Sequence, residues 1–423
     1  MLHTLSTQDV TTPGGLLLVL AVLVPFVGVL TGMVLGGRGA QRVALATLTV
    51  GFAIAIAIAA ALVRSGDAVI YILGGWAPPL GIALRADGLA VVMLLAVAVV
   101  ISGIGVYARA DFGTPQGVRE ARAPFVFWLL LLAVWGSLNL VFVSGDLFTL
   151  YVALELLTFA GVPLVSLSGQ PETLRSALRY LLYALFGSVL YLLGAVLLYG
   201  AYGTLDIGLL AERVRPEPVA WAAAALMTVG LMAKTALFPL HFWLPPAHAG
   251  APAAASAVLS ALVIKASFFL IIRLWLDVAP ALMTPMIAQI HAALGAAAIL
   301  FGSVLALRQA RLKLLIAYST VAQRGYLFLI FPLITRPESV TFAATDLVAI
   351  GVSTSAWTGG ILQVVSHALA KAAMFMAAGL IAQSLGHDRI ADLSSIGRAL
   401  PITVLAFALA GMSLMGLPPS GGF

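Results

Sequence analysis

The stretch LMAKTALFPLHFWLPP, residues 231–246, is apolar enough for a membrane helix, yet it carries Lys234 and is interrupted by Pro239, Pro245 and Pro246. Pro239 removes a backbone hydrogen-bond donor, and its ring clashes with the carbonyl four residues earlier. We therefore predict that a helix opens just after Lys234. Because hydrocarbon cannot satisfy the freed carbonyls, we expect them to line a water-filled cavity.

The composition indicates that this stretch lies in a membrane protein. Hydrophobic residues make up 62% of the 423 positions and charged residues 9%, whereas a soluble domain has roughly 25% charged residues. The mean hydropathy is +1.10. The absence of Cys excludes iron–sulfur clusters, thiolate metal sites and disulfides. The N-terminus lacks the basic region of a signal peptide, so we interpret the first apolar run as a retained helix.

Apolar runs recur along the chain and predict about twelve transmembrane helices in an all-α polytopic membrane protein. The runs lie near residues 15–35, 43–63, 87–108, 124–143, 146–167, 177–202, 219–240, 252–276, 285–307, 312–331, 346–383 and 400–417. An N-terminus outside places most loop arginines inside, as the positive-inside rule favours. This topology explains the net charge of +6 without a nucleic-acid partner.

Lys234, Lys265 and Lys371 lie deep inside apolar runs, whereas most arginines lie in loops. A buried lysine gives up its proton far more readily than an arginine. Snorkelling to the interface is the alternative, but Lys265 lies about twelve residues, roughly 18 Å, into its run. Ionisable groups at such depth are candidates for a function. We interpret these lysines as reversible proton carriers.

Glu155 is the only acidic residue in the middle of a predicted span, and we expect it to pair with Lys234. Each charge alone costs several kcal/mol in the membrane, and the pair costs less. A static ion pair that only locks two helices is the alternative interpretation.

Histidines and polar residues extend this candidate set. His241 and His248 bracket the interrupted stretch, and His367 lies four residues before Lys371, on the same helical face. Histidine relays protons near neutral pH, although a packing role is the alternative. The spacing provides too few ligands for a metal. Further candidates are Tyr318 and Ser319, which we expect to line a channel, His291, which we expect to pack, and Arg324, which we expect to bind a carbonyl or an acid.

A second interrupted run, LAGMSLMGLPPSGGF at residues 409–423, ends in Pro418 and Pro419. The two interrupted runs are the seventh and twelfth, five apart, which predicts two five-helix repeats. An odd number of spans makes the second repeat inverted, and transporters place ion sites at such breaks.

Several motifs together resemble the antiporter-like membrane subunits of respiratory complex I and of the Mrp sodium/proton antiporters. They are DLFTLYVALE (146–155), KTALFPLHFWLPPAHAGAPAAASAVLSALVIKASFFLIIR (234–273), RLKLLIAYSTVAQRGY (311–326), SHALAKAAMF (366–375) and GLPPSGGF (416–423). The resemblance implies a fold of about fourteen helices, with Glu155 and Lys234 as coupling pair and Lys265 as central proton carrier. It also implies that His241, His248, His367 and Lys371 line the axis between them.

On this basis we expect an N-terminal three-helix segment at 1–123, a first repeat at 124–278 and an incomplete second repeat at 279–423. The family motif matching GLPPSGGF is followed by a Lys or Glu and further helices, so we expect a truncated chain. The expected function is proton conduction within a complex I-like or Mrp-type complex of a bacterial inner membrane, with other membrane subunits as partners and sodium left open. No flavin or nicotinamide fingerprint is present, so we expect no cofactor and assign any redox chemistry to partners. A solute permease and a purely structural subunit remain alternatives.

Overall fold

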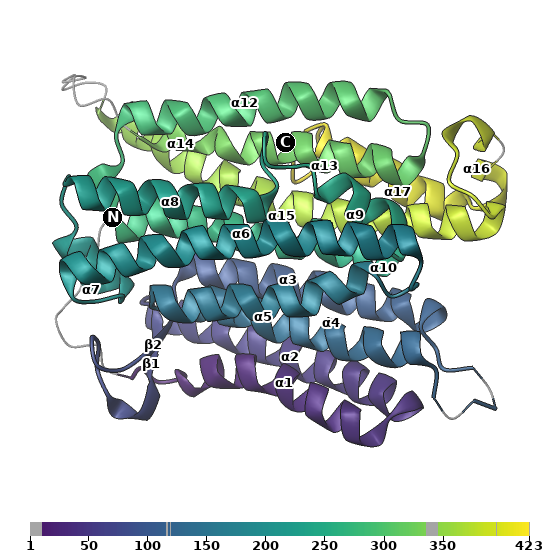
Figure 1. Cartoon of the computed structure of the whole chain (residues 1–423), viewed down its shortest axis with the longest axis horizontal. Coiled ribbons are helices and arrows are strands. Elements are labelled where there is room, and N and C mark those ends of the chain that lie inside the picture. The colour runs from purple at the N-terminus through teal and green to yellow at the C-terminus, as the bar shows by residue number, and fades with distance from the viewer. Residues whose placement is uncertain (1–10, 116, 119, 336–345, 395, 423) are drawn as a thin grey trace.

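The computed structural model describes residues 11–115, 117–118, 120–335, 346–394 and 396–422, without the side chains of 346–354. Long helices run side by side along one direction (Figure 1). In the described residues, eleven helical segments are long and apolar enough to cross a membrane. They are α1 (Leu16–Leu35), α2 (Gly37–Ser65), α3 (Gly88–Asp111), α4 (Arg122–Val143), α5 (Leu147–Val165), α6 (Pro171–Tyr202), α8 (Pro218–Thr235), the composite helix Ala253–Val278, α12 (Pro285–Leu307), Leu312–Ile334 and Ser355–Leu385 within α15 (Asp346–Leu385). The predicted all-α membrane architecture is confirmed.

The twelfth predicted run forms a shorter helix, α17 (Pro401–Leu414). The chain then turns through Pro418 and Pro419. Leu312–Ile334 likewise consists of two parts, α13 (Leu312–Phe328) and α14 (Ile330–Ile334). The interruption predicted at the twelfth run is present, because α17 ends at Leu414, before Pro418 and Pro419.

The two ends of the bundle carry short elements (Figure 1). At one end lie the antiparallel strands β1 (Val69–Ile72) and β2 (Ala83–Ala86), joined through η1 (Leu73–Gly75), and helix α7 (Ile207–Arg213). At the other end lies α16 (Ile396–Ala399), preceded by the turn η5 (Ile390–Asp392). The turn η4 (Pro280–Leu282) precedes α12. The hairpin was not predicted, because its strands lie in a connection that the search for apolar spans passes over.

The composite helix Ala253–Val278 is enclosed by the rest of the protein along its most apolar window. It consists of α10 (Ala253–Val258), the π-helical turn η2 (Leu259–Val263), α11 (Ile264–Arg273) and the π-helical turn η3 (Leu274–Val278). It packs against α3, α4, α5, α8 and α15. Lys265 lies in this helix, so its side chain has no direct route to lipid.

Arg273, near the end of this helix, ties it to the N-terminal helices. Its guanidinium makes two 2.6 Å contacts with the carboxylate of Asp87, the N-cap of α3, and one of 2.7 Å with Asp277. Burial by itself would raise the pKa of the Asp87 carboxyl, but the charge and hydrogen bonds of Arg273 hold that pKa below its usual value. The connection joins elements 186 residues apart in sequence.

α6 and α8 approach closely because each presents a glycine to the other. A Cβ atom added at Gly187 would lie 2.5 Å from the carbonyl oxygen of Gly230, and one added at Gly230 would lie 2.3 Å from that of Gly187. Small residues of this kind let membrane helices pack backbone to backbone. The close approach brings Ser188 of α6 beside Lys234 of α8.

The break predicted from Pro239 is confirmed, since α8 ends at Thr235. Ala236 follows in the left-handed conformation with φ of 51°, and the chain resumes as α9 (Leu244–Gly250). The prediction for Pro245 and Pro246 was wrong. Both lie in the first turn of α9, where the missing amide hydrogen would have no helical partner in any case, so they begin a helix instead of interrupting one.

Candidate functional site

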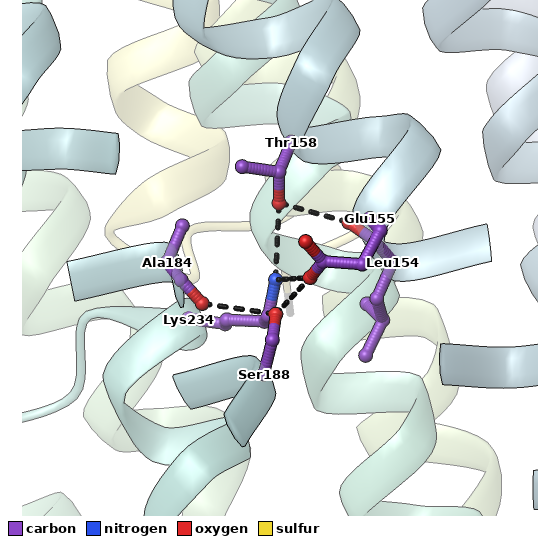
Figure 2. Close-up of polar contacts among 6 residues, drawn as sticks. All are labelled: Leu154, Glu155, Thr158, Ala184, Ser188 and Lys234. Atoms are coloured by element: carbon purple, nitrogen blue, oxygen red, sulfur yellow. Dashed lines mark hydrogen bonds and ion pairs between the residues drawn. The ribbon is translucent and has the colours of Figure 1, made fainter. Parts of the chain in front are cut away.

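Three helices position an ion pair beside the break. Glu155 lies in α5 and Lys234 in the last turn of α8, with Lys234 Nζ 3.5 Å from Glu155 Oε1. Ser188 of α6 donates its hydroxyl hydrogen to the same carboxylate oxygen. Figure 2 shows the lysine amine, the carboxylate and the serine hydroxyl converging at one point. The predicted pairing of Glu155 with Lys234 is present in the structure.

The pair is largely withdrawn from solvent and has one more polar neighbour. The side chains of Lys234 and Glu155 are 5% and 16% exposed. Lys234 Nζ also donates to Thr158 Oγ1 at 3.0 Å, and Thr158 donates to the Leu154 carbonyl at 2.8 Å (Figure 2). Lys234 thus divides its hydrogen bonds between a carboxylate and a hydroxyl. If the charge of one member of the pair changes, Lys234 still has its contact with Thr158 and Glu155 still has its contact with Ser188.

Side chains of the protein bind two carbonyls at the end of α8, where the sequence predicted water. The Ala233 carbonyl accepts a hydrogen bond from Trp243 Nε1 at 2.9 Å, and the Thr235 carbonyl accepts one from Arg324 Nη1. The expectation that Arg324 binds a carbonyl is confirmed. One donor lies at the N-cap position of α9 and the other in α13, so neighbouring segments hold the break.

Lys265 lies two residues after the π-helical turn η2. Its Nζ donates to the Ser260 carbonyl at 2.8 Å, five residues earlier in the chain. A π-helical turn loosens the regular backbone ladder, and such turns often mark functional sites. The hydroxyls of Ser260 and Thr320 lie 3.0 Å apart. The contacts of Lys265 therefore lead from α11 toward α13.

Lys371 reaches the same part of α13 from α15. Its Nζ donates to the Ile316 carbonyl at 3.2 Å and to the Ser319 hydroxyl. Thr320 donates to the same Ile316 carbonyl at 2.8 Å. Ser260, Thr320 and Ile316 thus link Lys265 to Lys371 inside the bundle, with the carbonyl of Ser260 contacting Lys265 and its hydroxyl contacting Thr320. The structure brings Ser319 into contact with Lys371. Tyr318 is half-buried in α13.

The three candidate histidines lie around these lysines. His248 and His367 are fully buried, and His241 is 2% exposed. His248 stacks on Phe375, with ring centroids 4.7 Å apart. In the described residues, neither ring nitrogen of His248 or His367 has a hydrogen-bond partner, and the same holds for Nδ1 of His241. No described protein group therefore holds these ring nitrogens.

His291 behaves as the packing residue that the sequence predicted. Its ring lies between Trp275 and Phe331, with centroid distances of 5.4 and 4.6 Å. Its Nδ1 lies 2.8 Å from the Ile287 carbonyl, one helical turn earlier. We therefore assign it no part in the site.

Sequence reasoning missed the hydroxyl residues that connect the charged groups. Thr158, Ser188, Ser260 and Thr320 are all buried, and residues of this kind in membrane helices usually bond to their own backbone. Only Thr158 had a usable signal, because it lies three residues after Glu155 and so on the same helical face. In the described part of the chain, no three His, Asp or Glu residues come together as a metal site requires.

The fold and this interior define a class, namely polytopic helical membrane proteins with a broken helix and buried ionisable groups at the break. The family model described as "NADH:quinone oxidoreductase/Mrp antiporter, TM" matches residues 144–347 and 338–423. The chain belongs to this family. It is an antiporter-like membrane subunit, as its motifs indicated.

Named relatives come from both branches of the family. The chain is 36% identical over 385 residues to NADH-quinone oxidoreductase subunit N of Desulforudis audaxviator, covering 90% of this chain and 71% of the relative. It is 29% identical over 416 residues to a Na(+)/H(+) antiporter subunit of Alkalihalophilus pseudofirmus, covering 96% and 78%.

Solved structures with a similar fold also belong to membrane complexes. A chain of the Mrp complex from Dietzia sp. DQ12-45-1b superimposes with a TM-score of 0.83 and 26% identity, covering 96% of this chain and 72% of that one. A chain of the membrane-bound sulfane sulfur reductase, an archaeal respiratory membrane complex, gives 0.81 and 26%, covering 96% and 78%. Both neighbours are subunits of multisubunit membrane complexes.

Proposed function

We propose that this chain conducts protons across the membrane through its buried Lys, Glu and His residues, as one subunit of a larger complex. The observation that carries the proposal is the polar series from Lys265 through Ser260, Thr320 and Ile316 to Lys371. Both lysines are at most 2% exposed, and their Nζ contacts in the described residues are with neutral oxygens. A lysine without a carboxylate partner gives up its proton more easily than a paired one.

In this mechanism Lys265 accepts a proton from the inner side through water and passes it toward Lys371. This transfer also uses water, because the backbone carbonyls of Ser260 and Ile316 accept hydrogen bonds but cannot pass on a proton. The Glu155–Lys234 pair controls the transfer electrostatically. When Lys234 is neutralised or recharged, its attraction for Glu155 changes, and the altered field changes the ease with which Lys265 holds its proton. Two unit charges about 7 Å apart at an effective dielectric near 20 interact by roughly 2 kcal/mol. That energy changes a protonation equilibrium about 30-fold.

We further propose that residues 124–278 and 279–423 form two related units behind a three-helix segment at 1–123. The two breaks support this division because they close with the same backbone pattern. After α8, Leu237 N bonds to the Met232 carbonyl at 3.1 Å, and after α17, Leu417 N bonds to the Met412 carbonyl at 3.2 Å. The amide at each break thus bonds to the carbonyl five residues earlier.

The relatives indicate the class of complex to which this chain would belong. We propose a complex I-like oxidoreductase or an Mrp-type cation/proton antiporter in a bacterial inner membrane, with the N-terminus outside. Any redox chemistry belongs to partner subunits, and sodium is a second candidate ion because the relatives include Na(+)/H(+) antiporter subunits.

The test replaces Lys265 by Gln in the intact complex. Gln keeps a donor for the Ser260 carbonyl but carries no transferable proton. In inverted native membrane vesicles we expect proton pumping to fall below about one tenth of wild type. Removal of a general acid–base group typically costs more than this, roughly 100-fold or greater. A native gel should show normal assembly. Arg175→Gln removes a charge from an exposed site of α6 and serves as the control. Pumping retained in an assembled Lys265→Gln complex would contradict the proposal.

A further inference from the structure

Arg324 is a buried cation in α13 that the proposed mechanism does not use. It is 1% exposed. Among the described residues, none of the ion pairs formed by Asp or Glu includes it. Its Nη1 donates to the Thr235 carbonyl, while Nε and Nη2 have no partner within the described part of the chain. An arginine stays protonated in proteins, so this position carries a permanent positive charge inside the bundle.

The carbonyl that Arg324 binds belongs to the residue directly after Lys234, at the last position of α8. A helix C-terminus has a partial negative charge that favours a cation. Arg324 therefore holds the broken end of the helix that carries the coupling lysine.

The neighbouring residue makes the same kind of contact with the second broken helix. Gln323 Nε2 donates to the Leu414 carbonyl at 2.9 Å, at the last position of α17. Two adjacent side chains of α13 thus hold the two breaks. One is neutral and the other is charged, so holding a terminal carbonyl does not by itself require a guanidinium.

The titratable groups around Arg324 come from several elements. Elements that pack against α13, or that a side chain of α13 contacts, carry Lys234 at the end of α8, His241 between α8 and α9, His248 in α9, Lys265 in the composite helix, and His367 and Lys371 in α15. α12, which also packs on α13, contributes His291, enclosed by aromatic rings. α13 itself carries Lys313, Tyr318 and Tyr326. All six of these lysines and histidines become positive when protonated, so Arg324 repels a proton on each of them.

We propose that Arg324 is a positioning residue that holds the end of α8 and, through its fixed charge, keeps the surrounding lysines and histidines from being protonated together. This inference rests on the proposed function. It adds a permanent charge that limits how many protons the interior holds at once.

The test compares Arg324→Gln with Arg324→Met in the intact complex, in inverted native membrane vesicles. Gln retains a donor for the Thr235 carbonyl and removes the charge, whereas Met removes both. Without the charge, the lysines hold their protons up to a higher pH. Charges about 10 Å apart at an effective dielectric near 20 shift a titration by about one pH unit. We therefore expect Arg324→Gln to assemble and to move the alkaline limb of pumping about one unit upward. Arg324→Met should show the same displacement with less assembled complex.

The control is Arg308→Gln, which removes an exposed arginine at the end of α12 and should leave the profile unchanged. A Gln variant whose profile coincides with wild type would overturn the inference. Failure of Arg324→Gln to assemble while Arg324→Lys assembles would also overturn it, because a neutral donor would then be unable to hold the break. If Lys265→Gln pumps normally, the proposed function fails instead, so the two failures are distinguishable.

Discussion

Replacement of Lys234 by Ala tests the coupling pair directly. Lys234 Nζ and Glu155 Oε1 lie 3.5 Å apart, and two unit charges at this distance attract by about 5 kcal/mol at an effective dielectric near 20. Removing one partner of a buried pair typically destabilises a protein by about 3–5 kcal/mol, because the other charge is left uncompensated. We expect a lower melting temperature of the assembled complex. We also expect pumping to fall about 30-fold, the factor that corresponds to a 2 kcal/mol change at the next lysine.

A second variant separates stability from function. The double replacement Glu155→Gln with Lys234→Met removes both charges, and uncharged replacements of buried pairs are often neutral or stabilising. We expect the double variant to recover the melting temperature but not the pumping. Lys234→Arg keeps the charge but cannot release a proton, so it should assemble and remain inactive.

The assay is dye-reported acidification of inverted native membrane vesicles, with assembly measured by native gel and melting temperature by a fluorescence ramp on the purified complex. Full pumping in the double variant would refute the reasoning, since the pair would then serve only to join helices. Full pumping in Lys234→Ala would refute it as well.

Two further changes test the framework that holds the site. Gly187→Ala should destabilise the complex by about 1–3 kcal/mol, because the new Cβ would lie 2.5 Å from a carbonyl oxygen of α8; Gly103→Ala in α3, with open space at its Cβ, should be neutral in the same melting experiment. Asp87→Asn weakens the contacts with Arg273. Arg273 lowers the pKa of the Asp87 carboxyl. The ionised carboxylate therefore contributes its full stabilisation above the unfolded-state pKa of about 3.9, and this stabilisation is lost as pH falls through the lower folded-state pKa. Melting curves of the variant should therefore depend less on pH below about 4, and equal slopes for variant and wild type would contradict this assignment.

The sequence by itself determined the membrane architecture and the place of the first break. Apolar runs marked the spanning helices because lipid requires every backbone group to be satisfied within a helix. Pro239 marked the end of α8 because proline has a local steric effect that any surroundings preserve. Lys234, Lys265 and Lys371 stood out because charges are rare at such depth. Each of these features is a local property of the chain.

Only the tertiary structure decided which groups meet. Ser188 lies beside Lys234 because α6 and α8 approach through glycines, and its hydroxyl donates to Glu155 of α5. Lys265 reaches α13 through Ser260 and Thr320. These hydroxyl residues look ordinary in the sequence because serine and threonine in helices usually bond to the preceding turn. Their partners depend on helix crossings between residues 33 to 60 positions apart. No periodicity or motif records such crossings, so the contacts that connect the buried charges are visible only in the folded chain.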